Sequence, residues 1–108
     1  MNKLNDYGIV SGWYLFELAD RAALEKLHNK YPGVKYWLTK HATTKFIRQI
    51  SATDKLFIDP VVDYDSNSSA SFTVNIICNN MTMAIVSISY RAKDHLAVKP
   101  YEQPKAKK

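Results

Sequence analysis

The sequence has a single cysteine and no long hydrophobic run, and each shortage excludes a class of protein. Because Cys78 stands alone, the chain forms no internal disulfide and lacks the paired cysteine spacing of a zinc site. No apolar run approaches the roughly 20 residues that cross a bilayer. The N-terminal residues 1–10 also lack the apolar stretch of a secretion signal. We therefore expect a cytoplasmic protein with no membrane span and no bound metal.

The net charge is also small over most of the chain. The formal net charge is +5, but from Arg91 onward there are six Lys or Arg and two Asp or Glu, which leaves nine against eight in residues 1–90. A nearly neutral body argues against a nucleic-acid partner. We expect residues 1–95 to form one domain, because 108 residues are too few for two cores. Residues 96–108 are expected to be a basic, mobile tail rather than a binding arm.

Hydrophobic spacing predicts one helix near the start of the chain. Apolar residues recur at helical spacing from about Gly12 to Lys30, among good helix formers. Ser11 stands at the N-cap position, and Tyr31-Pro32-Gly33 ends the helix.

Period-two patterns predict four strands after this helix, at 34–50, 55–64, 71–78 and 82–91. The polar segment 65–69 and the pair Asn79-Asn80 predict tight turns. Short links favour an antiparallel meander, because parallel strands need long crossovers. The predicted class is α+β, with the helix packed on the sheet.

Two segments resemble the motifs of hotdog-fold acyl-CoA thioesterases of the phenylacetate-degradation type, in order and spacing. Residues 11–23 resemble the helix signature H-G-G-x-x-F-x-L-A-D-x-A, with Gly12, Phe16, Leu18, Ala19, Asp20 and Ala22 in register. Residues 42–56 are similar to a strand pattern F-L-R-P followed by a G-D-x-L turn. The resemblance covers about residues 10–93 and implies one long helix wrapped by an antiparallel sheet, assembled as a homodimer or as a tetramer made of two dimers.

Three positions depart from the family pattern. Ser11 replaces the usual His, Trp13 replaces the second Gly, and Gln49 replaces the usual Pro. The family's first strand also has no counterpart in the ten residues before the helix. We therefore expect an edge of the sheet to be open to pairing with another chain.

The resemblance implies hydrolysis of an acyl-CoA thioester with Asp20 as base or nucleophile. In related thioesterases, this acid reaches across the dimer interface to a thioester held mainly by the other subunit. Thioester hydrolysis also needs donors for the developing oxyanion, and the backbone N–H groups of Gly12 and Trp13 at the helix start are the candidates. The alternative for Asp20 is a side chain that faces solvent.

The remaining candidates are substrate contacts. Ser11 and Glu17 flank the expected site; Glu17 either raises a pKa by lying beside Asp20 or sits at a rim against water or a lysine. Trp13 is either a substrate wall or a core or interface residue. Because coenzyme A carries phosphates, basic residues near strand ends could bind it, although each could instead be a solvated surface charge: Arg48, Lys55, Arg91 and Lys93.

No cofactor is expected apart from coenzyme A as part of the substrate. His41 and Cys78 lack a third group to orient them as a nucleophile pair, and His28 and His95 are expected at the surface. The departures at Ser11 and Trp13 favour one rival, a non-catalytic acyl-CoA or lipid-binding module. A dehydratase is disfavoured, because no histidine precedes the helix.

Overall fold

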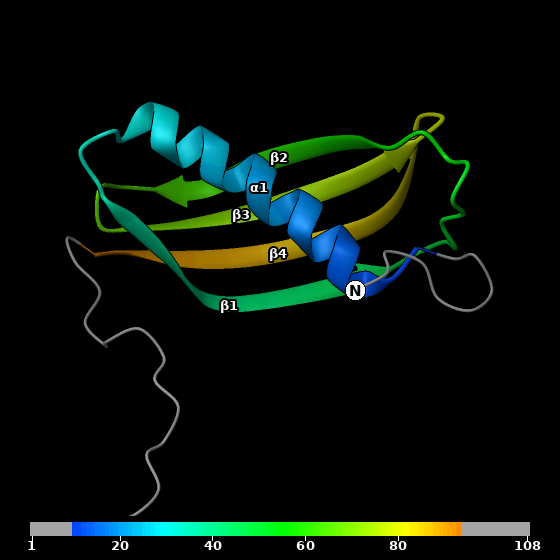
Figure 1. Ribbon diagram of the computed structural model, residues 1–108, viewed down its shortest axis with the longest axis horizontal. Coiled ribbons are helices and arrows are strands. Elements are labelled where there is room, and N and C mark those ends of the chain that lie inside the picture. Colours follow the sequence, from blue (N-terminus) through cyan, green and yellow to red (C-terminus); the bar gives the residue numbers. More distant parts are fainter. Residues whose placement is uncertain (1–9, 94–108) are drawn as a thin grey trace, which may run out of the picture.

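The protein folds as one helix lying across one face of a four-stranded antiparallel sheet (Figure 1). A computed structural model describes residues 10–93; His95 and the predicted tail at 96–108 lie outside the described residues. The elements are α1 (Gly12–Lys30), β1 (Tyr36–Phe46), β2 (Phe57–Asp65), β3 (Ser69–Cys78) and β4 (Met81–Lys93). The predicted α+β class and both ends of the predicted helix are confirmed.

Helix α1 packs on the sheet through one stripe of small and medium apolar side chains. Leu15, Ala19, Ala23 and Leu27 follow each other at intervals of four and are fully buried. Ser11 has the extended backbone of an N-cap residue, with φ −78° and ψ 155°, but its hydroxyl makes no capping hydrogen bond. The N-cap position is therefore as predicted, and the capping contact is not formed.

The strand order is β1-β4-β3-β2, and every neighbouring pair is antiparallel. Strands β2, β3 and β4 form the predicted meander, but the meander prediction is wrong for β1, which pairs with β4. Residues 47–56 are long enough to carry the chain past the ends of β3 and β4 to the far edge of the sheet (Figure 1). The predicted first strand, 34–50, stops at Phe46 because the N–H groups of Ile47 and Arg48 turn to the Met83 carbonyl.

Both predicted turns are present. Asn79 and Asn80 adopt the left-handed conformation, with φ of 52° and 65°, as a two-residue hairpin with the right-handed twist requires. At the β2–β3 turn, the Ser66 hydroxyl accepts the N–H groups of Ser68 and Ser69, each at 3.1 Å.

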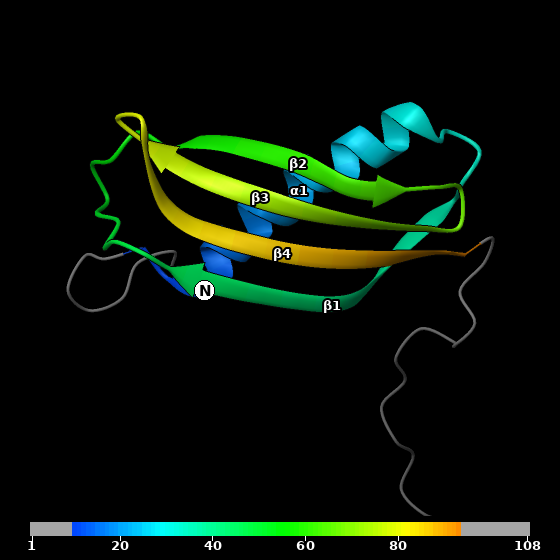
Figure 2. The ribbon, with the colours of Figure 1, turned by 180° about the vertical axis from the view of Figure 1, so that it is seen from behind.

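The core lies between α1 and the even-numbered residues of β3 and β4. Alternate residues of these central strands are buried, ending with Tyr90, which is 1% exposed. No described element covers the opposite face of the sheet (Figure 2). Strands β1 and β2 are the two outer strands, and β2 exposes a row of large apolar side chains: Phe57, Val61, Val62 and Tyr64.

Candidate functional site

The predicted base, Asp20, is half-buried on α1 and is held by the sheet. The Tyr90 hydroxyl donates a hydrogen bond of 2.6 Å to its Oδ1. Tyr90 lies on β4, where its ring meets the Phe72 ring edge to face, with centroids 6.1 Å apart. Burial, together with the hydrogen bond and the negative charge of Asp20, raises the pKa of Tyr90 far above its usual value. The phenol therefore stays protonated as a donor, and Asp20 does not simply face solvent.

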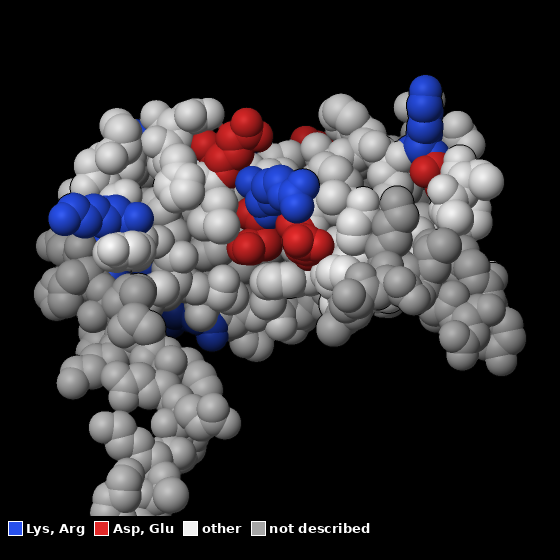
Figure 3. Space-filling view, viewed as in Figure 1, with Lys and Arg blue, Asp and Glu red and all other residues white. Residues whose placement is uncertain are grey.

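Glu17 does not join Asp20 as a second carboxylate. It is exposed and forms an ion pair of 3.6 Å with Arg21, one turn further along the helix. Figure 3 shows a basic side chain with acidic ones around it over the middle of α1, and further basic side chains toward the two sides of the same face. The rim position considered for Glu17 is the observed one, with an arginine as its partner.

The start of α1 is lined by aromatic rings. A Cβ atom added at Gly12 would lie 3.3 Å from Cε2 of Phe46, so glycine allows this ring to lie against the helix start. Trp13 is 38% exposed and meets Tyr14 edge to face, with ring centroids 6.0 Å apart. Trp13 is therefore not a core residue. The hydroxyl oxygen of Ser11 is buried and has no hydrogen-bond partner among the described residues.

The two parts of the expected site are separated along the helix. Asp20 follows Gly12 by eight residues, which is about 12 Å at the rise of an α-helix. A single thioester is far smaller than this gap, because oxyanion donors must lie about 3 Å from the oxygen and the base within hydrogen-bond reach of the attacking water. For both parts of one chain to act together, the side chain, the attacking water and the thioester carbonyl would have to lie almost in line along the helix.

The candidate basic residues are also divided. Phe46, two residues before Arg48, pairs with Ala84, whereas Arg91 pairs with Leu38. Seven positions of β4 separate these pairs, or about 23 Å at the rise of a strand. Arg48 and Lys55 belong to the connection at one end of the sheet, and Arg91 and Lys93 lie at the other. The four side chains do not form one basic mouth within the chain.

A cavity of about 270 Å³ opens beside the start of α1. It lies between the helix and the connection 47–56, and Asp20 is not among its lining residues. Its walls are mostly apolar, with a polar rim from Ser51 and Asp54: Val10, Tyr14, Leu18, Ala52, Leu56 and Ile58.

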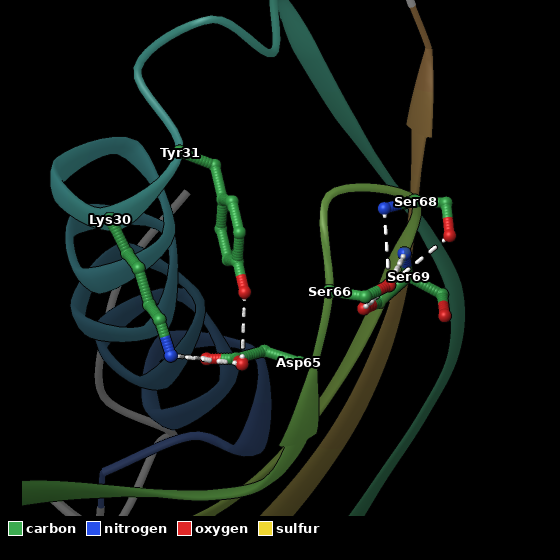
Figure 4. Close-up of polar contacts among 6 residues, drawn as sticks. All are labelled: Lys30, Tyr31, Asp65, Ser66, Ser68 and Ser69. Atoms are coloured by element: carbon green, nitrogen blue, oxygen red, sulfur yellow. Dashed lines mark hydrogen bonds and ion pairs between the residues drawn. The ribbon is translucent and has the colours of Figure 1, made fainter.

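A second polar cluster fastens the end of α1 to the end of β2 (Figure 4). Lys30 Nζ donates to both carboxylate oxygens of Asp65 at 3.0 Å, and the Tyr31 hydroxyl donates to Asp65 Oδ1, also at 3.0 Å. The hydrogen bond from Lys30 lowers the pKa of Asp65, and that pairing raises the pKa of Lys30. Burial and the hydrogen bond to Asp65 raise the pKa of Tyr31. This carboxylate is compensated by a cation.

His41 and Cys78 lie far apart. His41 is exposed opposite Ser89, and the buried Cys78 is opposite Met81, eight positions away along β4, or about 26 Å. Residues 10–93 contain no group of three His, Cys, Asp or Glu side chains that could hold a metal ion. In the same range, no helix combines the length and hydropathy needed to cross a membrane.

Tyr90 and the cavity beside the helix start were missed by the sequence analysis. The period-two pattern of β4 indicates an inward side chain at position 90, and a buried tyrosine hydroxyl usually finds a partner. That signal predicts a polar contact without naming Asp20.

No protein-family model and no curated protein sequence matches this chain, but solved structures do. The E. coli PaaI protein from the phenylacetic acid degradation operon superimposes with a TM-score of 0.73 at 22% identity, over 84% of this chain and 64% of that one. A gentisyl-coenzyme A thioesterase gives 0.72 at 16% identity, over 83% and 78%. A Streptococcus mutans protein bound to acetyl CoA gives 0.70 at 21% identity, over 84% and 72%.

This chain has the hotdog fold. The fold predicted from the two motifs is thereby confirmed. Structural similarity at such low sequence identity shows the fold. It does not show the activity, which depends on the residues of the site.

Proposed function

We propose that this hotdog protein hydrolyses an acyl-CoA or related thioester. The observation that carries the proposal is the carboxylate of Asp20, which lies half-buried on the helix with one oxygen held by Tyr90. A half-buried carboxylate is costly unless it is paired or functional, and neither ion pair of residues 10–93 involves Asp20. The thioesterase and coenzyme A complexes among the structural neighbours support the same reaction.

In the proposed reaction, Asp20 acts as a general base or as a nucleophile. As a base, its carboxylate takes a proton from water while the water oxygen bonds to the thioester carbon. Backbone N–H groups at the helix start, at Gly12 and Trp13, stabilise the oxyanion. The C–S bond then breaks, and the thiolate leaves and takes up the proton, giving a carboxylic acid and free coenzyme A. Arg48 and Lys55 at one end of the sheet, together with Arg91 of a second copy, are the proposed contacts for its phosphates. Glu17 is proposed to lie at the rim, and Ser11 to contact the substrate beside the helix start.

We propose that the working unit is a homodimer, alone or paired into a tetramer. The gap of about 12 Å between Gly12 and Asp20 favours a site to which two copies contribute, one with the base and the other with the oxyanion donors. The outer strand β2 also carries unpaired backbone groups and exposed apolar side chains, a combination that favours pairing with another chain. The proposed compartment is the reducing cytoplasm, which suits a chain with one cysteine.

A thiol-release assay across aliphatic and aromatic acyl-CoAs tests the reaction. The expected result is turnover of at least one substrate that disappears in Asp20→Asn. Loss of turnover in the variant with unchanged far-ultraviolet circular dichroism supports the role of Asp20. Full activity in Asp20→Asn would overturn it.

Two substitutions at Gly12 test the oxyanion donor. Gly12→Pro removes the N–H at a helix position where proline is tolerated, and Ser11 already has the extended backbone that precedes a proline. Gly12→Ala keeps the N–H and serves as the matched control, because both variants add a Cβ near Phe46. We expect Gly12→Pro to lower kcat by about 10²-fold, and Gly12→Ala to lower it far less.

Mixing inactive variants tests the shared site. In an equal mixture of Asp20→Asn and Gly12→Pro subunits, half of the dimers are mixed, and each mixed dimer contains one intact pair. Activity should return to about a quarter of the wild-type level if the site spans two chains. A mixture that exchanges subunits and stays inactive would place the site within one chain.

The second candidate is a non-catalytic acyl-CoA or lipid-binding module. The exposed indole of Trp13 at the helix start favours it, because it stands where the family has a glycine and can occupy the space of the thioester carbonyl. This candidate predicts that a non-hydrolysable acyl-CoA analogue raises the melting temperature, while no acyl-CoA releases thiol. Thiol release by the wild-type protein would exclude it.

A further inference from the structure

Among the described residues, Tyr90 donates the hydrogen bond that joins the sheet to the Asp20 side chain, and it does so from a rigid position. It lies on β4, which is paired on both sides, opposite Thr39 of β1 and Ala70 of β3. It is the largest fully buried side chain among the described residues, and the Phe72 ring meets its edge. The ring therefore has little freedom, and the position of its hydroxyl is set by the sheet.

The contact restrains the carboxylate. At 2.6 Å, the bond from Tyr90 Oη to Asp20 Oδ1 has the length of a charge-assisted O–H···O hydrogen bond. An aspartate side chain has two torsions, and anchoring one oxygen limits both, so the direction of the second oxygen is also limited. The nearby residues Glu17 and Arg21 are exposed and form an ion pair with each other. In the described part of the chain, Tyr90 is the hydrogen-bond donor that orients this carboxylate.

We infer that Tyr90 is a positioning residue for Asp20: its hydroxyl holds Oδ1 and leaves Oδ2 as the oxygen that reacts. The inference rests on the proposed function, because it assigns a role within that site. Tyr90 itself lies under the helix and touches neither water nor thioester in the reaction. The hydroxyl keeps its proton throughout, so no additional proton enters the reaction scheme.

The chain supplies a matched control. Tyr31, at the C-terminal end of α1, also donates its hydroxyl to an aspartate that joins helix and sheet, at 3.0 Å to Asp65 (Figure 4). Tyr31→Phe and Tyr90→Phe each remove one hydroxyl and keep the ring. They differ in which carboxylate loses its donor.

The test compares kcat and KM for the thioester that the wild-type protein hydrolyses best. We expect Tyr90→Phe to lower kcat about tenfold and to leave KM within about twofold, because a donor to a charged group is lost while substrate contacts remain. Tyr31→Phe should leave both constants within about twofold. In an Asp20→Asn background, Tyr90→Phe should cause no further loss, since the two residues act as one unit.

Four kinetic outcomes overturn the inference. Equal losses of kcat in both tyrosine variants would indicate general loosening of the fold. A raised KM with unchanged kcat in Tyr90→Phe would indicate a substrate contact. Full activity of Tyr90→Phe beside an inactive Asp20→Asn would refute the positioning role and leave the proposed function intact. A wild-type protein that hydrolyses no thioester would overturn the proposed function and this inference with it.

A second measurement does not depend on turnover. A buried hydroxyl proton bonded to a carboxylate exchanges slowly, so proton NMR of the wild-type protein should show a low-field Tyr90 signal. Asp20→Asn should shift this signal upfield, because the acceptor becomes neutral, and the Tyr31 signal should not move. A Tyr90 hydroxyl that responds in no way to Asp20→Asn would overturn the inference.

Discussion

Helix α1 is joined to the sheet by two tyrosine–aspartate contacts, and they differ in how the negative charge of the aspartate is balanced. Asp65 accepts hydrogen bonds from Tyr31 and from the ammonium group of Lys30. Asp20 accepts one from the neutral hydroxyl of Tyr90 and takes part in neither ion pair of residues 10–93. The two contacts therefore combine the same two residue types, but only Asp65 has a cation beside it.

The difference separates a structural carboxylate, Asp65, from Asp20, the carboxylate that we propose to be reactive. The ammonium group of Lys30 balances the charge of Asp65 and lowers the pKa of its carboxyl group. Asp65 is therefore a poor base, and its contacts hold the helix against the sheet. The half-buried Asp20 has one oxygen, Oδ2, that accepts no hydrogen bond from another side chain of residues 10–93. Burying such a carboxylate without a cation lowers the stability of the fold. This cost favours the proposed catalytic role of Asp20.

The largest expected effect is on turnover at one aspartate alone. General-base assistance is typically worth 10²–10⁴-fold, so Asp20→Asn should lower kcat by about that factor and leave substrate binding largely unchanged. Asp65→Asn, the same substitution at the other contact, should leave kcat within about twofold. Steady-state thiol release measures both variants. Comparable losses at the two positions would end the distinction between them.

The second effect is on stability, and it should fall on the other aspartate. Asp65→Asn removes the charge that Lys30 binds and should lower the urea midpoint of unfolding. Asp20→Asn keeps an oxygen acceptor for Tyr90 and removes a half-buried charge, so its midpoint should stay unchanged or rise. Urea denaturation followed by tryptophan fluorescence compares the two. If the urea midpoint falls as far in Asp20→Asn as in Asp65→Asn, both carboxylates serve to hold the helix against the sheet.

Much of the fold follows from local sequence, because its determinants are local. Helix α1 has the predicted ends, since its apolar stripe begins after Ser11 and stops before Pro32. The hairpin at Asn79 and Asn80 follows from two residues that tolerate positive φ. The partner of β1 was not predictable in this way. Its pairing with β4 closes a long connection, and short-range spacing carries no information on which sheet edge a distant strand joins.

The site was predictable only in part, for the same reason. Asp20 is marked by its motif and by the cost of a carboxylate on an apolar helix. Its donor lies 70 residues away, and the contact depends on where the helix crosses the sheet. That crossing is decided by the packing of Leu15, Ala19 and Ala23 on the central strands, which no local pattern specifies.

A third effect is on the pH dependence of stability. The pKa of Asp65 in the folded protein lies below its usual value of 3.8, so the folded state favours the ionised form. Its contribution is fully present above pH 3.8 and is lost as the pH falls through the lowered pKa. The difference in urea midpoint between wild type and Asp65→Asn should therefore be constant near neutral pH and shrink below pH 3.8. A difference that persists unchanged in acid would show that the ion pair with Lys30 contributes nothing.

The smallest effect should come from the exposed pair Glu17–Arg21, which lies one turn from Asp20 and resembles neither contact. Its two side chains are 49% and 72% exposed and are joined at 3.6 Å, so solvent screens their attraction. Arg21→Gln should lower the free energy of unfolding by about 0.3–0.5 kcal/mol, the value typical of an i,i+4 pair on a helix surface. It should also leave kcat within about twofold, because the carboxylate of Asp20 is oriented from the sheet by Tyr90. Thermal unfolding at low and high salt, combined with thiol release, measures both quantities. A loss of kcat in Arg21→Gln approaching that of Asp20→Asn would show that charge on the solvent side of the helix governs the site, and the contrast between the two tyrosine–aspartate contacts would then no longer explain where the reactive carboxylate lies.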